Sequence, residues 1–162
     1  SALKATQLRP SDPQAWASLV QARYESAGQG GNFDANTQQY TSSGIKELGA
    51  AAQAWQRYLK LTPHPSSDIA VLAARAYDAT SDYANEARSW EIVSAANPTA
   101  ATYYEYLANA AYRAKEVHKG DLAAAKAVSL TPKLQQFQLQ QQLKQIKTAA
   151  LSPTQTTSVP GK

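Results

Sequence analysis

Few side chains in this sequence have the chemistry that catalysis requires. Its 162 residues include no cysteine and two histidines, which excludes a thiolate nucleophile, a disulfide framework and a thiolate zinc site. His64 stands between two prolines and His118 lies near Lys115 and Lys119, so both histidines are expected to be solvated. Motifs for a nucleophilic serine, a phosphate loop and a dinucleotide-binding loop are also missing. We therefore predict no catalytic residue, no metal site and no cofactor, and a protein that is not an enzyme.

One string of oxygen-bearing side chains is similar to the start of a calcium-binding loop. Asp34, Asn36 and Gln38 alternate as the first ligands of such a loop do. The sixth position is Gln39 instead of glycine, and the twelfth is Ile45 instead of glutamate. Because the sharp turn and the bidentate ligand are both missing, calcium binding is not expected.

Four prolines indicate how the surrounding elements are organised. Pro98 lies 35 residues after Pro63, and Pro132 lies 34 residues after Pro98. Each follows an Ala- and Leu-rich stretch with helical periodicity, where a proline ends the helix. Pro10 belongs to the same series if the repeat before Pro63 carries an insertion. The chain is therefore expected to be an array of helical repeats.

The spacing of apolar residues predicts where the helices lie. Asp12 and Pro13 form a good helix start, with a cap followed by proline at the first helical position. The segment 28–45 is rich in Gly, Asn, Gln and Thr and is read as an inserted loop, which Phe33 and Tyr40 could pin onto the first helix pair. Helices are expected over 13–27, 46–61, 68–80, 83–96, 100–115, 120–130 and 133–150, with a turn near Lys119, Gly120 and Asp121.

These features resemble the tetratricopeptide repeat family, a 34-residue helix-turn-helix repeat. The family places a large aromatic residue and a leucine in the first helix, as Trp16 with Leu19 and Tyr104 with Leu107 do. The middle repeat departs from the pattern, since Ala70 stands where the aromatic residue is expected. The resemblance implies an all-α superhelix of three helix pairs, with a leading partial repeat and a C-terminal capping helix.

The same resemblance divides the chain into one repeat domain and a tail. Trp16, Trp55 and Trp90 recur at framework positions and are expected to fill the space between helices. The domain is expected to span 1–150, comprising the end of a preceding repeat (1–10), a repeat with the inserted loop 28–45 (11–63), two further repeats (64–98 and 99–132) and the capping helix (133–150). Residues 151–162 are predicted to be a disordered tail.

The family resemblance implies that the first helix of each pair lines a concave groove that binds a protein segment. A non-enzymatic protein–protein interaction scaffold or adaptor is therefore the predicted function. The residues predicted by their spacing to face the groove are Gln14, Ala17, Gln21, Tyr24 and Glu25 in the first repeat, Asp68, Val71, Arg75 and Asp78 in the second, and Thr102, Glu105, Asn109, Tyr112 and Arg113 in the third.

One specialised form of this groove does not match the sequence. Some members of the family hold a peptide's terminal carboxylate with paired Lys and Asn side chains on successive first helices. Asn109 and Arg113 could belong to such a clamp, but the first repeat has Gln21 and Glu25 in place of a matching pair, and the second supplies only Arg75. We therefore do not expect the carboxylate-clamp subtype.

The predicted C-terminal helix has two apolar sides. Leu139, Leu143 and Ile146 form a stripe that could cover the last repeat, as a polar-backed cap must do. Leu134 and Phe137 fall on the opposite side of the helix. They either pack on the preceding turn or form a surface for a partner or for self-association. A structural or self-assembling spacer module is therefore an alternative function.

The positive charge is concentrated at the C-terminal end. The chain has a formal net charge of +4, with 8 Lys/Arg and 10 Asp/Glu in residues 1–112 and 8 Lys/Arg against 2 Asp/Glu in residues 113–162. An RNA-binding accessory protein that uses this end is a further alternative. No repeat-wise code for reading bases is visible, so specific nucleic-acid recognition is not expected.

The sequence favours one cellular location only weakly. No apolar run approaches the ~20 residues needed to cross a bilayer. The chain begins at Ser1 without an initiator methionine, within a structural unit, so we expect it to be a section of a longer protein. Its low charge and its lack of Cys and Met favour the soluble part of a membrane-tethered protein in a bacterial cell envelope, with a cytoplasmic protein as the alternative.

Overall fold

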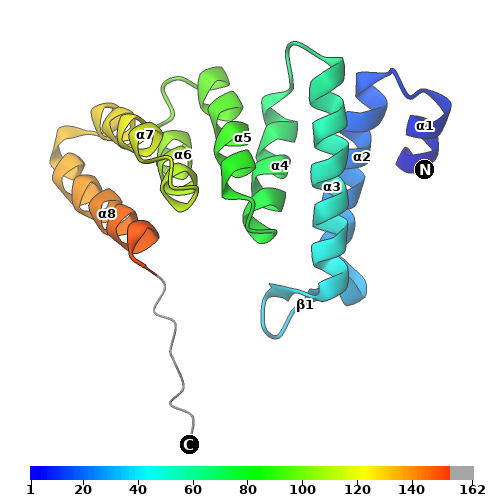
Figure 1. The fold of residues 1–162 in the computed structure, drawn as a ribbon, viewed down its shortest axis with the longest axis horizontal. Coiled ribbons are helices and arrows are strands. Elements are labelled where there is room, and N and C mark those ends of the chain that lie inside the picture. Colours follow the sequence, from blue (N-terminus) through cyan, green and yellow to red (C-terminus); the bar gives the residue numbers. More distant parts are fainter. Residues whose placement is uncertain (154–162) are drawn as a thin grey trace, which may run out of the picture.

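The computed structural model describes residues 1–153, which form an all-α fold apart from one short hairpin (Figure 1). The helices are α1 (Ala2–Leu8), α2 (Pro13–Ala27), α3 (Ser42–Leu61), α4 (Ser67–Ala79), α5 (Tyr83–Ala96), α6 (Ala101–Arg113), α7 (Val117–Leu130) and α8 (Lys133–Leu151). A 3-10 turn, η1 (Gly30–Asn32), leads into the strands β1 (Phe33–Asp34) and β2 (Gln39–Tyr40). The predicted all-α class is confirmed, and none of the helices in residues 1–153 is long and apolar enough to cross a membrane.

Several predicted helix boundaries are confirmed. The expected ranges 13–27 and 83–96 coincide with α2 and α5. In each helix an aspartate caps the first turn, since the Asp12 side chain accepts a hydrogen bond from Gln14 N at 2.9 Å, and the Asp82 side chain accepts one from Asn85 N at 3.3 Å. Local capping chemistry thus sets these boundaries.

The predicted first residues of two helices were wrong. In each helix a glycine that was expected to lie in a loop or turn is packed closely against another part of the chain. Helix α3 begins at Ser42 instead of 46, because Thr41 caps it and Gly44 packs so tightly that a β-carbon there would collide with Asn32 O. Helix α7 begins at Val117, so Gly120 lies inside the helix instead of in a turn, where a β-carbon would collide with the Tyr112 ring. Glycine is a common signal for a loop, but at these two positions it permits close packing.

Two turns have the same conformation at equivalent positions of successive helix pairs. Ser81 between α4 and α5 has φ 60°, and Lys115 between α6 and α7 has φ 64°. Since 115 − 81 = 34, these left-handed residues are separated by the spacing of the proline series. In both turns the next residue donates its amide N–H to a carbonyl near the end of the preceding helix, from Asp82 to Tyr77 O at 2.9 Å and from Glu116 to Ala111 O at 2.8 Å.

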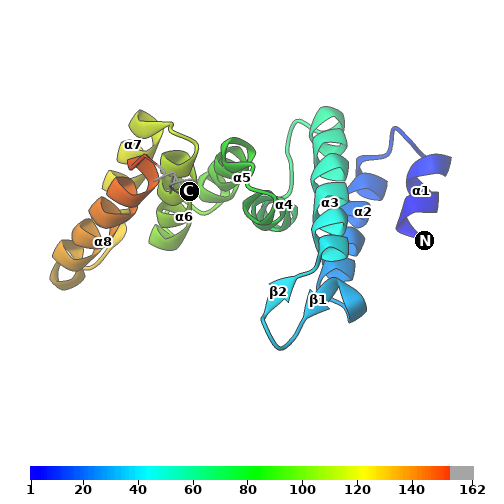
Figure 2. The same ribbon diagram turned by 60° about the horizontal axis from the view of Figure 1, so that its bottom comes forward.

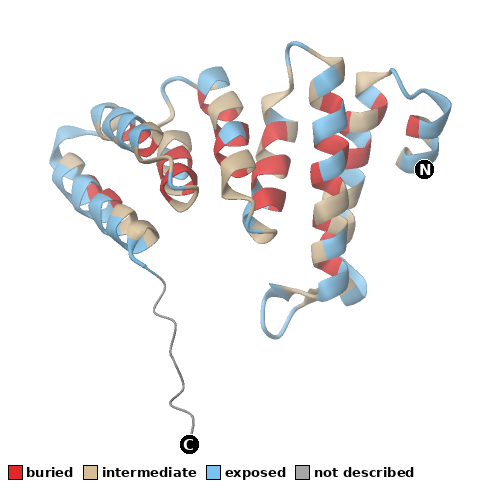
Figure 3. Cartoon of the chain, viewed as in Figure 1, coloured by how far each residue is buried: buried red, intermediate tan, exposed pale blue. Residues whose placement is uncertain are grey.

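The helices pack in sequence order from α1 at one end to α8 at the other (Figures 1 and 2). The most extensive packing is within α2–α3, α6–α7 and α4–α5, while α5 against α6 and α3 against α4 join these pairs. Buried residues lie where neighbouring helices meet (Figure 3). The core is built largely from alanine, with large side chains such as Trp55, Tyr77, Trp90 and Tyr112 between the helices. This agrees with the framework role expected for Trp55 and Trp90, whereas Trp16 is only half-buried.

The inserted segment is an ordered hairpin instead of a loop without secondary structure. Phe33 and Tyr40 pair across β1 and β2, with ring centroids 5.4 Å apart in an edge-on arrangement. Tyr40 also packs with Tyr24 and Ala79 against a small buried cluster between α2, α3 and α4. The expectation that Phe33 and Tyr40 pin this segment onto the first helix pair is confirmed for Tyr40, whereas Phe33 contacts Tyr40. Figure 2 shows the hairpin beside α3.

Helix α8 buries one side and exposes the other. Leu139 and Leu143 are buried and Ile146 is half-buried in the core, as the stripe predicts. The side chains of Leu134 and Phe137 are 99% and 71% exposed, so the interpretation that they pack on the preceding turn was wrong. Of the predicted tail 151–162, residue 151 is the last of α8, and the part from 154 onward lies outside the described residues.

Candidate functional site

The strongest candidate site is a pocket of about 270 Å³ between α4, α5 and α6. Four side chains expected to face the groove converge there, although they come from two helices that are not consecutive in the chain. These are Arg75 and Asp78 from α4 and Asn109 and Arg113 from α6. Glu86, Trp90 and Tyr106 complete the lining.

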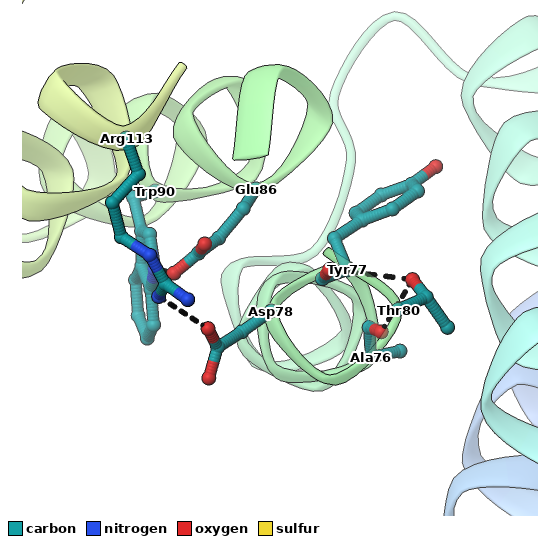
Figure 4. Close-up of polar contacts among 7 residues, drawn as sticks. All are labelled: Ala76, Tyr77, Asp78, Thr80, Glu86, Trp90 and Arg113. Carbon is teal, nitrogen blue, oxygen red and sulfur yellow. Dashed lines mark hydrogen bonds and ion pairs between the residues drawn. The ribbon is translucent and has the colours of Figure 1, made fainter. Parts of the chain in front are cut away.

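Helical spacing explains why these residues meet. Arg75 and Asp78 are three residues apart on α4, and Asn109 and Arg113 are four apart on α6, so each pair shares one face of its helix. Helix α5 packs between α4 and α6. At the end of α4, Thr80 Oγ1 donates a hydrogen bond to Ala76 O at 2.9 Å, which closes the last turn of the helix (Figure 4).

An ion pair joins two of the residues that line the pocket. Arg113 Nη1 lies 2.5 Å from Asp78 Oδ1, which links α6 to α4. The Arg113 guanidinium also lies over the Tyr83 ring, 3.9 Å from its centroid, in cation–π geometry. Since Tyr83 begins α5, this one side chain of α6 contacts both α4 and α5. Arg113 therefore holds α4, α5 and α6 together at this point.

Glu86 is the most unusual polar residue of the site. Its side chain on α5 is only 5% exposed, and its Oε1 accepts a hydrogen bond from Trp90 Nε1 at 3.2 Å. Oε2 is buried, and none of the residues 1–153 forms a hydrogen bond with it. Burial and the nearby negative charge of Asp78 raise the pKa of Glu86 to about 7, against the opposing effects of the Trp90 hydrogen bond and the positive Arg113. This carboxyl group therefore keeps its proton to a higher pH than an ordinary glutamate does.

Aromatic rings form one wall of the pocket. The Trp90 and Tyr106 ring centroids are 4.8 Å apart at 40°, and Trp90 also stacks on Tyr103 with 6.1 Å between centroids. Trp90 is buried, whereas Tyr106 is 42% exposed. Figure 4 shows Glu86, Trp90 and Arg113 directed into the same space beside Asp78. The site thus combines an aromatic wall with charged groups of both signs.

Two further groove residues lie in a separate pocket. Thr102 and Glu105 face α8 across a space of about 390 Å³, which Gln135 and Gln138 line from the opposite side. This pocket is polar and contains a single ionisable side chain, that of Glu105. It extends the candidate surface along α6 but lacks a buried charged group.

The groove residues of the first repeat lie apart from the pocket between α4, α5 and α6. On α2, Gln21 Nε2 donates to Glu25 Oε1 at 2.9 Å on an exposed face, and Gln14 is also exposed. Tyr24 packs beside the hairpin, and Ala17 is buried in the core. Ala17 therefore does not face an open groove. On α4, Asp68 is exposed and Val71 is half-buried against the core.

Spacing predicts that Tyr112 faces the groove, but its side chain is buried between helices. Its side chain is 2% exposed and packs against Gly120. The hydroxyl donates to Asp121 Oδ1 at 2.8 Å, and the Lys147 ammonium lies 5.8 Å from the ring centroid. Tyr112 is thus a packing residue between α6, α7 and α8. The prediction was wrong because it assigned two adjacent residues, Tyr112 and Arg113, to the same face of α6, although their side chains contact different neighbours.

Three lining residues were missed by the sequence analysis. Glu86 and Trp90 lie on α5, the second helix of its pair, which was not considered as a source of groove residues. Tyr106 lies on α6 outside the predicted stripe. A signal for Glu86 was available, because it shares a helical face with Trp90 and Val93, and a carboxylate on an apolar face is rarely without a role.

The calcium-like string forms a tight turn at the tip of the hairpin. Asp34 Oδ1 accepts hydrogen bonds from Asn36 N at 2.8 Å and Thr37 N at 3.3 Å. These backbone hydrogen bonds lower the pKa of Asp34. Within residues 1–153, no group of three or more His, Cys, Asp or Glu side chains could hold a metal ion.

No family model matches this chain, and no similar sequence is found among curated proteins.

Proposed function

We propose that this protein is a non-enzymatic interaction module of the tetratricopeptide type, which binds a segment of a partner protein along α4 and α6. The observation that carries the proposal is the pocket between α4, α5 and α6, in which Arg75, Asp78, Asn109 and Arg113 converge. A mixture of aromatic wall and charged groups is common where proteins recognise peptides.

The repeat architecture supports the same proposal. The pairs α2–α3, α4–α5 and α6–α7 have the most extensive packing, and the left-handed turn residues Ser81 and Lys115 recur 34 residues apart. Helical repeats of this length stack so that one helix of each pair lines a continuous surface. Such a surface suits an extended or helical peptide better than a small molecule.

Site-specific photocross-linking tests the proposal. A photoreactive amino acid at Asn109, in the pocket, should give a cross-linked partner in the cells that make this protein. The same amino acid at Gln53, on an exposed face of α3, is the matched control. Arg75→Glu should abolish the cross-link from position 109 by reversing the charge of the pocket. Equal cross-linking from position 53, or a cross-link unaffected by Arg75→Glu, would contradict groove binding.

Self-association is a second candidate because Leu134 and Phe137 project from α8 with 99% and 71% of their surface exposed. In a self-assembling spacer this side of α8 would contact another copy. Light scattering after size-exclusion chromatography should then show concentration-dependent dimers that Phe137→Gln removes. A monomer at all concentrations would exclude this function.

The positive C-terminal end offers weaker support for nucleic-acid binding. Lys119 pairs with Glu91 at 3.3 Å and Glu116 at 2.5 Å, and Lys147 pairs with Asp121 at 2.8 Å. Because these charges are balanced within the molecule, fewer remain for phosphate contacts. We therefore do not propose specific nucleic-acid binding.

A further inference from the structure

Two apolar pockets lie on either side of α7. The first, which we call the α5–α7 pocket, has a volume of about 410 Å³, and its apolar lining consists of Tyr104, Leu107, Leu122 and Ala123. The second, the α7–α8 pocket, has a volume of about 400 Å³, and its apolar lining consists of Ala124, Ala125, Val128 and Leu143. Leu122 is 61% exposed and Ala125 is also exposed, so α7 presents apolar side chains to solvent beside both pockets.

The α5–α7 pocket lies on a different side of α6 from the candidate groove. Tyr104 and Leu107 of α6 line this pocket, whereas Asn109 lines the pocket between α4, α5 and α6. Successive residues of a helix are separated by about 100°, so Tyr104 and Leu107 point about 140–160° away from Asn109. The two pockets therefore open in nearly opposite directions from α6.

The acidic groups of the two pockets on α7 are already paired with lysines. In the α5–α7 pocket, Glu91 Oε1 lies 3.3 Å from Lys119 Nζ. In the α7–α8 pocket, Asp121 Oδ1 lies 2.8 Å from Lys147 Nζ. These carboxylates are therefore neutralised within the molecule and offer little attraction to a cationic partner.

Each pocket has a second lysine whose charge is not balanced in this way. Lys126 lines the α5–α7 pocket and Lys144 lines the α7–α8 pocket, and both are exposed. Neither forms an ion pair with any of the residues 1–153. The Lys126 ammonium lies 6.0 Å from the centroid of the Tyr104 ring, which places its charge beside the apolar lining. Both pockets thus combine an apolar surface with an available positive charge.

This combination favours one kind of occupant. Apolar side chains of a ligand would cover Leu107, Leu122 and Leu143, and acidic groups beside them would meet Lys126 and Lys144. An amphipathic helix with apolar residues three or four positions apart and acidic residues between them supplies both. A membrane surface would be contacted by protruding apolar side chains, whereas here most of the apolar groups line recesses.

We propose that α7 and its two flanking pockets form a second docking surface, which binds an acidic amphipathic segment of a partner protein. Apolar side chains of that segment enter the pockets, and its carboxylates pair with Lys126 and Lys144. This inference goes beyond the proposed function, because the surface lies on the opposite side of α6 from the groove. Its failure would leave the proposal of groove binding unchanged.

NMR titration of the ¹⁵N-labelled protein with three acetylated and amidated peptides at low ionic strength tests this inference. Each peptide has about 16 residues, long enough to form a helix. The first has leucines three or four positions apart with glutamate and alanine between them, the second replaces each glutamate with lysine, and the third replaces each leucine with glutamine. We expect only the first to shift the amide signals of Leu122, Ala125 and Lys126, without shifting the side-chain amide of Asn109.

Charge-reversed variants test the role of the two lysines. Lys126→Glu combined with Lys144→Glu should weaken binding of the first peptide about tenfold or more, because both attractive charges become repulsive. Lys46→Glu combined with Lys60→Glu is the matched control, since it changes the net charge equally at exposed positions of α3. This control should reduce the affinity less than about twofold.

A second pair of variants tests the apolar contact. Leu122→Gln should weaken binding of the first peptide about tenfold, as the loss of an apolar anchor does. Leu134→Gln, at an exposed position of α8 outside both pockets, should leave the affinity unchanged. Because Leu122 and Leu134 are both exposed, neither substitution should disturb folding.

Four results would overturn the inference. The lysine peptide or the glutamine peptide could bind as tightly as the first, the first peptide could shift only signals of the pocket between α4, α5 and α6, or it could shift none. The fourth is flotation of the native protein, but not of Leu122→Gln, with vesicles of phosphatidylglycerol and phosphatidylcholine, which would assign the surface to a membrane. The native protein alone decides the first three.

Discussion

The middle of this molecule buries a charged side chain, whereas its C-terminal end exposes large apolar ones. Between α4, α5 and α6, a carboxyl group is 5% exposed and an aromatic wall is packed against it. On α8, Leu134 and Phe137 are exposed, while Lys147 and Asp121 pair near the surface. Burying a polar group is costly unless it has partners, whereas an exposed apolar side chain costs little. The middle region is therefore where changes should have large effects on stability.

Trp90→Ala should produce the largest effect on stability. The substitution removes a buried ring and also the indole donor to Glu86 Oε1. We expect the free energy of unfolding to fall by about 3–5 kcal/mol, as for other buried aromatic residues. Phe137→Ala, the control on α8, should change it by less than ~0.5 kcal/mol. Urea denaturation measures both, and equal losses would show that the two regions do not differ as described.

Glu86 should make stability depend on pH. Its pKa in the folded protein is raised to about 7 from an ordinary value of 4.5, so the folded state binds more protons between these values. The contribution of Glu86 to the free energy of unfolding should therefore be greatest below pH 4.5. It should decrease by about 3 kcal/mol as the pH rises to 7 and above. Comparing urea unfolding of the native protein and Glu86→Gln from pH 5 to 8 isolates this contribution. A constant difference between them would show that Glu86 does not titrate in this range.

Two glycines within helices should respond in opposite directions. Gly120→Ala places a β-carbon against the Tyr112 ring and should destabilise the protein by about 1–3 kcal/mol through overpacking. A β-carbon on Gly49 in α3 has open space around it, so Gly49→Ala should stabilise the helix by about 0.5–1 kcal/mol. Thermal unfolding followed by circular dichroism compares the two variants. A stabilising Gly120→Ala would mean that Tyr112 can move aside.

Leu134→Gln combined with Phe137→Gln should have the smallest effect on the folded monomer. Both side chains are exposed on α8, so the melting temperature should stay within about a degree of the native value. If α8 mediates self-association, light scattering should show dimers for the native protein and monomers for this double variant. A marked loss of monomer stability would instead mean that these side chains pack within the molecule.

Much of the fold could be predicted from the sequence, because local rules control it. Proline positions, apolar periodicity and capping aspartates are short-range features, and they placed α2 and α5 at their observed residues. The hairpin was harder to predict, since its two-residue strands are too short to show alternation. The roles of Gly44 and Gly120 depend on neighbours distant in sequence, which periodicity does not reveal.

The candidate site could be predicted only in part. Arg75, Asp78, Asn109 and Arg113 follow from spacing on α4 and α6. Tyr112 differs from Arg113 by one position, or about 100° around the helix, and this difference turns its side chain toward Gly120 instead of the pocket. Spacing alone does not indicate how wide the exposed stripe of a helix is, because that width depends on which helices pack beside it.

By itself, the sequence determined an all-α chain of helices, their approximate limits and the absence of cysteine chemistry. Each of these depends on residue type or on contacts within one or two helical turns. Only the tertiary structure decided that α5 contributes Glu86 and Trp90 to the pocket, and that Oε2 of Glu86 is buried without a donor from the described part of the chain. Burial and electrostatic environment are properties of several packed helices together. For that reason the pKa of Glu86, and the pH dependence that follows from it, could not be derived from the order of residues.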